Sequence, residues 1–347
     1  MKNRHLGMEG LEGRWMMAGD VSAHVTGGDL VVTGGGGNDT VLIVFKSDGV
    51  KVKGRDGTTI NGESKQFLTG VRDDLRVDLN GGDNALLVRN GSLNFLGIET
   101  DGGNDLIGLV NVDADVMNIR TRGGDDAIGI GKANVRFDLI IDSGDSNNGD
   151  DGPLFEDDAV GVTGSRIGDD LIINTGNGAD QIGLGRVGAL AAALEALYPG
   201  DIGYGALAVR GTTRIDSAGN ADTIFATDAD FRRFVSIDAS SGYDFVKLKR
   251  VRARDNMHVN SGDQDDHLKV KDSRFEDLAR FDGGDGSDYL NLRGDNDFDR
   301  QVFINWEDQG LSEAFADAHD LPTGGGSSTS GGGSSGGAVF SGASFTS

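Results

Sequence analysis

Apolar and polar residues alternate along most of the chain in short runs separated by glycine-rich turns. After each turn an apolar pair occupies alternate positions, as in Ile182 and Leu184, Val246 and Leu248, Leu268 and Val270, and Leu290 and Leu292. A second alternating pair comes later in the repeat, as in Leu171 and Ile173, Val235 and Ile237, and Met257 and Val259. Alternation of this kind is typical of a strand with one buried face. Each repeat therefore predicts at least two short strands.

The repeats are marked by an aspartate two residues before the first apolar position. The regularly spaced members are Asp158, Asp180, Asp222, Asp244, Asp266 and Asp288, and upstream Asn84, Asp105 and Asp126 follow one another at a constant spacing of 21. Four of the five intervals in the first group equal 22, and the interval from Asp180 to Asp222 is 42. A single repeat cannot bury its own apolar face, so neighbouring repeats must stack. The pattern predicts an all-β parallel β-helix (β-solenoid) of ~22-residue coils, expected to be right-handed.

Three regions follow from this pattern. Residues 1–20 precede the repeats, residues 21–308 form the solenoid, and residues 309–347 hold the remnant of a cap and a Gly/Ser-rich tail. Two insertions lengthen the coils, at about 143–157 and 186–208. The first is an acidic loop. The second contains GALAAALEALYPG, whose alanines and leucines favour a helix and whose proline and glycine would end it, so one short helical excursion is expected.

Composition narrows the classes of partner. The 347 residues include 32 basic and 56 acidic side chains, for a formal charge of −24. This balance argues against nucleic acid or an anionic membrane as the main partner and favours cations. The chain has no cysteine, which excludes disulfides and thiolate metal sites. No apolar run is long enough to predict a transmembrane helix.

Three segments carry resemblances to two known families. Gly283 to Asn291 reads GGDGSDYLN and Gly34 to Leu42 reads GGGGNDTVL, and both fit the nonapeptide GGxGxDxUx. The chain therefore resembles hemolysin-type (RTX-like) calcium-binding repeats over about residues 30–295, with a strict match in two or three turns. Met8 to Val21, MEGLEGRWMMAGDV, resembles the LEPR-XLL motif of bacterial surface and secreted proteins. The second resemblance implies export, to the cell surface or the extracellular space.

Resemblance to these repeats implies that turn carbonyls and the repeat aspartates hold Ca²⁺ between coils. Hard cations require several oxygen ligands, and stacked carboxylates about 5 Å apart repel one another unless a cation lies between them. The candidate metal ligands are Asp39, Asp180, Asp244, Asp263, Asp266, Asp282, Asp285 and Asp288. The alternative is that aspartates and asparagines of the repeats, such as Asn174, Asp238 and Asn260, form hydrogen-bonded ladders to turn N–H groups.

The favoured hypothesis is an exported structural, adhesive or matrix-associated repeat protein that binds Ca²⁺ and contacts cell-surface or matrix components, polysaccharide among them. A carbohydrate-active β-helix, of the polysaccharide lyase or glycosidase kind, is the alternative enzyme class. No constellation of catalytic residues stands out, because the five histidines, His5, His24, His258, His267 and His319, are scattered. The chain is therefore not expected to be an enzyme.

A further alternative is a module that binds acidic polysaccharide. Cations recur at the same repeat positions in KLKRVRARD and LKVKDSR, which places Lys247 over Lys269, Lys249 over Lys271 and Arg252 over Arg274. Such a stripe should lie on the outer face of the solenoid, either as a solvated face balanced by nearby acids or as a site for a polyanion.

Overall fold

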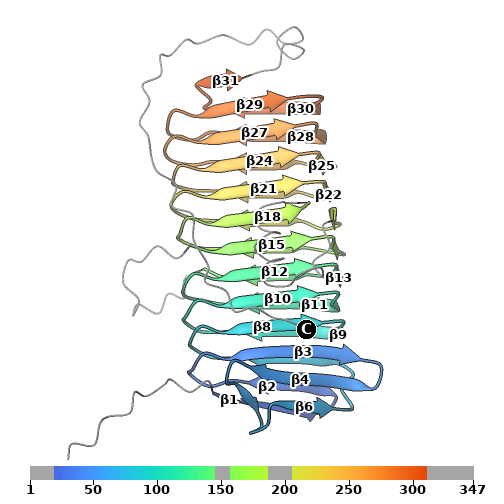
Figure 1. Ribbon diagram of the computed structural model, residues 1–347. Helices are drawn as coiled ribbons and strands as arrows, with labels where there is room; N and C mark the ends of the chain where they lie inside the picture. The colour runs from blue at the N-terminus through green and yellow to red at the C-terminus, as the bar shows by residue number, and fades with distance from the viewer. Residues whose placement is uncertain (1–18, 145–156, 187–204, 311–347) are drawn as a thin grey trace, which may run out of the picture.

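The computed structural model describes residues 19–144, 157–186 and 205–310, and these form a parallel β-solenoid (Figure 1). All regular structure in these residues is strand, so the predicted all-β solenoid is confirmed. The predicted helical excursion at Gly188 to Gly200 and most of the acidic loop lie outside the described residues. Within the described ranges, nothing forms a helix long and apolar enough to span a membrane.

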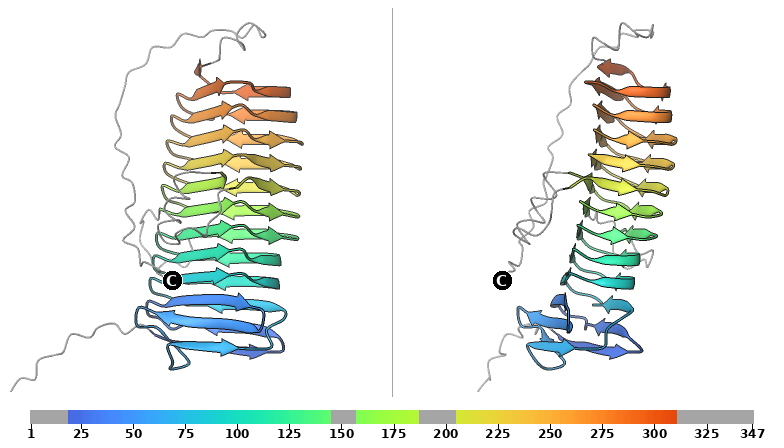
Figure 2. Two further views of the ribbon diagram at one scale, coloured as in Figure 1. Left: turned by 45° about the vertical axis from the view of Figure 1, so that its right-hand side comes forward. Right: turned by 90° about the vertical axis from the view of Figure 1, so that its right-hand side faces the viewer.

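Sheet 1 runs the length of the solenoid with thirteen strands, most of them contributed one per coil (Figure 2). In spatial order the strands are β31 (Asp308–Gly310), β29 (Tyr289–Arg293), β27 (His267–Lys271), β24 (Phe245–Lys249), β21 (Thr223–Thr227), β18 (Gln181–Gly185), β15 (Ala159–Thr163), β12 (Ala127–Gly131), β10 (Leu106–Val110), β8 (Ala85–Arg89), β3 (Thr40–Lys46), β4 (Gly49–Arg55) and β6 (Lys65–Leu68). From β3 to β31 neighbouring coils pair in parallel.

Sheet 2 faces sheet 1 across the core and has eighteen strands. In chain order they are β1 (Asp20–Thr26), β2 (Asp29–Thr33), β5 (Thr59–Ile60), β7 (Asp74–Asp78), β9 (Ser92–Glu99), β11 (Asp113–Arg120), β13 (Asn134–Val135), β14 (Leu139–Asp142), β16 (Arg166–Ile167), β17 (Leu171–Asn174), β19 (Leu207–Val209), β20 (Thr213–Asp216), β22 (Ala229–Phe231), β23 (Val235–Asp238), β25 (Arg252–Ala253), β26 (Met257–Asn260), β28 (Arg274–Asp282) and β30 (Asp297–Ile304).

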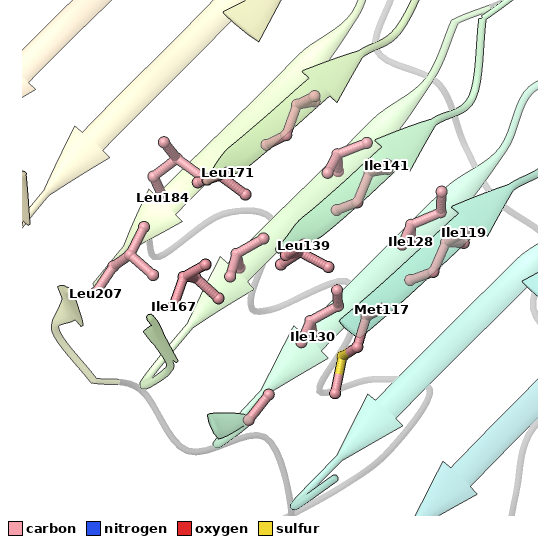
Figure 3. Close-up of a cluster of buried hydrophobic side chains, with 14 of the residues drawn as sticks. Met117, Ile119, Ile128, Ile130, Leu139, Ile141, Ile167, Leu171, Leu184 and Leu207 are labelled. Carbon is pink, nitrogen blue, oxygen red and sulfur yellow. The ribbon is translucent and has the colours of Figure 1, made fainter. Parts of the chain in front are cut away.

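The core between the sheets is a stack of aliphatic layers (Figure 3). In sheet 1, Ile128 pairs with Val160, and Val160 pairs with Ile182 in the following coil. All three side chains are at most 1 % exposed. Like residues therefore lie on like residues from coil to coil, which is the packing that the alternating pattern predicts.

The two insertions leave the strands in register. Ala127 pairs with Ala159 across the first insertion, and Gln181 pairs with Thr223 across the second. The flanking strands therefore align position by position across both insertions.

The first coils differ from the repeat pattern because several of their strands are antiparallel. β1 pairs antiparallel with β2, and β4 pairs antiparallel with both β3 and β6. Alternation of apolar residues does not distinguish parallel from antiparallel pairing, so the sequence predicted strands here without their direction. These extra strands cover the N-terminal edge of the solenoid, where a row of unpaired backbone groups would otherwise be exposed.

Aromatic side chains fill the last layers at the other end. Phe275 stacks on Phe298 with ring centroids 4.7 Å apart, and Phe281 stacks on Phe303 at 5.5 Å. Trp306 packs against the same cluster, and its indole N–H donates to the Phe281 carbonyl at 3.1 Å. Larger rings at this end cover an apolar layer that has fewer coils stacked upon it.

Candidate functional site

A continuous column of buried side chains runs up the solenoid where each glycine-rich turn enters sheet 1. Its members each stand one residue before a strand of that sheet: Asp39, Asn84, Asp105, Asp126, Asp158, Asp180, Asp222, Asp244, Asp266 and Asp288. Every one of them is at most 3 % exposed. We call this column the aspartate ladder.

Hydrogen bonds connect the ladder from coil to coil. The backbone N–H of Asp222 donates to Oδ1 of Asp244 at 2.7 Å, and the N–H of Asp244 donates to Oδ1 of Asp266 at 2.8 Å. The same bond recurs along the column, from the N–H of Asp39 on Asn84 to the N–H of Asp288 on Glu307. A buried N–H that finds no partner is strongly destabilising, so one carboxylate oxygen per coil has a structural role.

A second, more exposed series of bonds runs beside the ladder in the opposite direction. The N–H of Asn104 donates to Oδ1 of Asp83 in the preceding coil at 3.0 Å, and the N–H of Asp125 donates to Oδ1 of Asn104 at 3.1 Å. Each of these residues stands one position before a ladder residue. Two consecutive N–H groups of a turn thus bond to side chains in the two neighbouring coils.

The second carboxylate oxygen of several ladder residues has no such partner. Oδ2 is buried without a hydrogen bond to any described residue in Asp244, Asp266 and Asp288, whereas hydroxyl groups of Thr100, Thr121 and Ser217 act on Asp105, Asp126 and Asp222. A buried oxygen that carries charge and accepts no hydrogen bond is costly. The ladder therefore requires a further positive or hydrogen-donating group in each of these coils.

Asn84 shows which acceptors a hydrogen-donating group at this position can satisfy. Its side-chain amide donates to the carbonyl of Asn80 at 3.1 Å and to the carbonyl of Gly82 at 2.7 Å. These carbonyls stand four and two residues before the ladder position. Where aspartate occupies that position, the repeat places an oxygen instead of an NH₂ group beside the two equivalent carbonyls. By analogy with Asn84, we expect three oxygens to face one another there, and a donated hydrogen or a cation among them is needed to remove the repulsion.

The backbone of the turn is alike in other coils. Asn80 and Gly82 have positive φ angles of 55° and 97°, and the residues four and two positions before Asp244, Ser240 and Gly242, have φ angles of 63° and 146°. Successive turns are also tightly stacked, since a Cβ on Gly242 would lie 1.8 Å from the Asn220 carbonyl oxygen of the preceding coil. The conformation of the Asn84 turn is therefore a guide to the turns of Asp126, Asp222, Asp244 and Asp266, which have positive φ angles at both positions, whereas the turn of Asp288 has one at Gly284 and none at Gly286.

Burial raises the pKa of the ladder carboxyls. Desolvation is the largest cause in each case, and it raises the pKa of Asp105 and Asp244 to about 7, of Asp266 to about 8 and of Asp222 to about 9. Neighbouring ladder carboxylates add to the effect at Asp222 and Asp266. Burial likewise raises the pKa of Asp288 to about 6. Without a cation, much of the ladder retains protons at neutral pH.

Hydroxyl groups beside the ladder offset part of this rise in some coils. The Ser217 hydroxyl acts to lower the pKa of Asp222, against the larger effect of burial. The equivalent residue of the next coil is Ala239, which has no hydroxyl. At Asp244, the hydrogen bond from the Asp222 N–H is what opposes the rise in pKa. The second oxygen of Asp244 is thus a clear candidate for a cation ligand.

Five of the eight candidate ligands predicted from the sequence belong to the ladder: Asp39, Asp180, Asp244, Asp266 and Asp288. The other three lie elsewhere. Asp263 and Asp285 are exposed in the turns and form backbone bridges with one another. Asp282 ends β28, where its carboxylate pairs with Arg280 at 2.8 Å and accepts the Asn305 amide at 3.0 Å.

The ladder also contains residues that the list of candidate ligands did not include, namely Asp105, Asp126, Asp158 and Asp222. Their spacing of 21 or 22, or of 32 and 42 across the insertions, was the signal that identifies them. A residue's place in the repeat therefore predicts whether it belongs to the ladder, and the match of its glycine turn to the nonapeptide does not.

A third column, at the ends of strands in sheet 2, contains both aspartates and asparagines. The Asn174 amide donates to the Asp142 carboxylate at 2.9 Å, and the Asn260 amide donates to Asp238 at 3.0 Å. Hydrogen-bonded polar stacking was expected for Asn174, Asp238 and Asn260, but with turn N–H groups as donors. These pairs join side chain to side chain instead.

Among the described residues, the one group of three acidic side chains whose ligand atoms lie within 4.8 Å of one another is formed by Asp138, Asp169 and Asp170, outside the ladder. The Oδ1 atom of Asp138 accepts the Asp170 N–H at 3.1 Å, and that of Asp170 accepts the Thr212 N–H at 2.6 Å. These bonds account for the position of two of the three carboxylates without a metal.

Comparison of the chain with protein-family models, with curated proteins and with solved structures found no match. The class is therefore defined by the structure itself, as a parallel β-solenoid with a buried carboxylate ladder.

Proposed function

We propose that the chain is an exported structural repeat protein, adhesive or matrix-associated, whose solenoid is stabilised by Ca²⁺ in the aspartate ladder. One observation carries the calcium proposal. In successive coils a buried carboxylate oxygen without a hydrogen-bond partner occupies the position from which the Asn84 amide donates to two turn carbonyls. A cation beside that oxygen would gain ligands of the kind that Ca²⁺ prefers.

The donor set favours Ca²⁺ over Mg²⁺. All the groups at the site are oxygens, and the ladder carboxylates among them are at most 3 % exposed. Mg²⁺ is smaller, requires nearly ideal octahedral geometry and retains bound water, whereas Ca²⁺ accepts irregular sets of six to eight oxygens. In this proposal the ladder residues bind the ion through Oδ2 while Oδ1 keeps the backbone bond between coils.

A role outside the cell is consistent with this chemistry. The motif at Met8 to Val21 resembles that of exported proteins, and the chain has no cysteine to stabilise the fold by disulfides. Cation binding that depends on the folded turns would stabilise the folded chain by mass action. We propose a scaffold that is stable where Ca²⁺ is abundant, and we assign no catalytic role to it.

Thermal unfolding tests the proposal. The melting temperature of the full chain at pH 8 is expected to rise by roughly 10 °C or more between EDTA and millimolar Ca²⁺, and to change little in Mg²⁺. The double variant Asp266→Ala/Asp288→Ala should lose a large part of this rise. Asp263→Ala/Asp285→Ala is the matched control, since it removes two exposed carboxylates from the same two turns and should retain the rise.

Equal rises for Ca²⁺ and Mg²⁺, or a full calcium response in the ladder variant, would refute the assignment of Ca²⁺ to the ladder. A response lost only in the control variant would instead place the cation at the exposed turn residues.

A further inference from the structure

A cationic surface lies on the outer face of sheet 1, across strands β24, β27 and β29 near the C-terminal end of the solenoid (Figure 1). It consists of Lys247, Lys249, Lys269, Lys271 and Arg293, which alternate with the buried apolar residues of the same strands. We call it the lysine face. It contrasts with a chain of formal charge −24.

Strand register arranges these cations in two columns. Lys247 pairs with Lys269 in one column, and Lys249 pairs with Lys271, which pairs with Arg293, in the other. Neighbouring strands are about 4.8 Å apart and alternate residues of one strand about 6.7 Å apart. The four lysine side chains thus start from the corners of a small rectangle on one surface.

Few acidic groups balance this surface. Among the described residues, Lys271 forms an ion pair with Asp272 at 3.9 Å, whereas Lys247, Lys249 and Lys269 form none. The Lys247 ammonium instead lies over the Phe225 ring, 5.7 Å from its centroid. Like charges directly opposite one another in a sheet are destabilising, so these lysines lower the stability of the free protein.

The arginines at the recurring cationic positions of the sequence differ from the lysines in their ion pairs. Arg252 and Arg274 pair in sheet 2, and both bond to the Glu276 carboxylate, at 2.9 Å and 3.2 Å. Arg274 also approaches Asp297 at 3.5 Å. The stripe predicted from the sequence is therefore two surfaces, of which the arginine part is neutralised by acids and the lysine part is not.

Aromatic rings adjoin the lysine columns on the side nearer the aspartate ladder. The Phe245, His267 and Tyr289 rings follow one another with centroids 5.0 Å and 4.8 Å apart, each about edge-to-face. Partly exposed rings beside cations offer apolar contact and charge to one ligand.

We propose that the lysine face binds a linear acidic polysaccharide, with its carboxylates on the lysine columns and its sugar rings against the aromatic column. Charge complementarity selects a polyanion. The acidity of the whole chain disfavours the dense phosphate charge of nucleic acid, whereas more widely spaced carboxylates suit a surface of five cations. This inference is independent of calcium in the ladder.

Binding to immobilised hyaluronan tests the inference, with dextran as the neutral polysaccharide and single-stranded poly(dT) as the nucleic acid. We expect the full chain to bind hyaluronan, not dextran, with an affinity that falls as salt rises. Lys247→Ala/Lys269→Ala should weaken binding by about tenfold or more. Arg166→Ala/Arg214→Ala removes the same charge from exposed positions of sheet 2 and should leave the affinity within about twofold.

Absence of hyaluronan binding by the unaltered chain overturns the inference, as does equal weakening in the two variants. Binding to poly(dT) that is as tight and as dependent on Lys247 and Lys269 overturns the choice of polysaccharide. In Ca²⁺, Arg166→Ala/Arg214→Ala should melt at the temperature of the unaltered chain, and Lys247→Ala/Lys269→Ala at that temperature or slightly above it, because like charges directly opposite one another are removed. Loss of hyaluronan binding alone thus separates this surface from the proposed calcium sites.

Discussion

Replacing Asp244 by alanine is expected to lower the free energy of unfolding by about 2–4 kcal/mol. The change removes the acceptor of the Asp222 N–H, which donates to Asp244 at 2.7 Å, and leaves that N–H buried without a partner. It also opens a small cavity in a column that is at most 3 % exposed. Urea unfolding with a constant m-value would measure the loss.

Asparagine at the same position should behave in the opposite way. Asp244→Asn keeps the Oδ1 acceptor and supplies an NH₂ group for the Ser240 and Gly242 carbonyls, as Asn84 does for its own turn. In EDTA at pH 8 this variant should be at least as stable as the unaltered chain. If asparagine destabilises the chain as much as alanine does, the turn carbonyls do not face the second carboxylate oxygen.

Asp265→Ala is the matched control for the alanine substitution. Its Oδ1 accepts the Ser287 N–H at 2.9 Å, but this bond is exposed to solvent. Water can replace the lost acceptor there, so the expected loss is below about 1 kcal/mol.

The metal-free chain is expected to lose stability as pH rises from 6.5 to 9. The ladder carboxyls have folded pKa values of about 7 to about 9 at Asp105, Asp244, Asp266 and Asp222, against an ordinary value of 3.8. In this window the unfolded chain has already released these protons, whereas the folded chain still binds them. Stability therefore falls with pH, by up to about 1.4 kcal/mol per pH unit for each retained proton, until the folded groups ionise.

Other groups oppose this trend at lower pH. The pKa values of His258 and His267 are lowered by burial, so protonation of the unfolded chain below about pH 6.5 favours unfolding. Arginine partners lower the pKa of Asp228 and Asp230, and their contribution is lost only under more acidic conditions. The window from pH 6.5 to 9 isolates the ladder.

Denaturant unfolding in EDTA across this window, repeated in millimolar Ca²⁺, gives the measurement. Calcium should flatten the profile, because a bound cation replaces the retained protons. A metal-free stability that is constant or rises up to pH 9 would show that the ladder does not hold protons in the folded state.

The sequence was sufficient to predict the solenoid and the alignment of the ladder. Apolar alternation fixed which face of each strand is buried, and the constant interval between repeats aligned Asp222 with Asp244 and Asp266. Stacking like residues upon like residues is the only way for such repeats to bury their apolar faces, so the inference from pattern to fold was direct.

The sequence did not predict which turn side chains point inward and which point to solvent. Asp263 and Asp266 are both acidic and lie in the same turn, yet the first is exposed and the second is buried. Left-handed residues such as Gly262 and Gln264, with φ angles of 107° and 84°, determine which of them points inward. Nothing in the sequence indicates that a glutamine will adopt a left-handed backbone conformation. The role of Asn84 likewise required the positions of two carbonyls that no spacing rule gives.

The most direct test of calcium in the ladder is an anomalous difference map from crystals of the full chain grown with millimolar Ca²⁺. The account predicts peaks beside the second carboxylate oxygens of Asp244, Asp266 and Asp288, within coordination distance of the turn carbonyls. A map without peaks along the ladder, from crystals in which these carboxylates keep their bonds to the backbone, would contradict it.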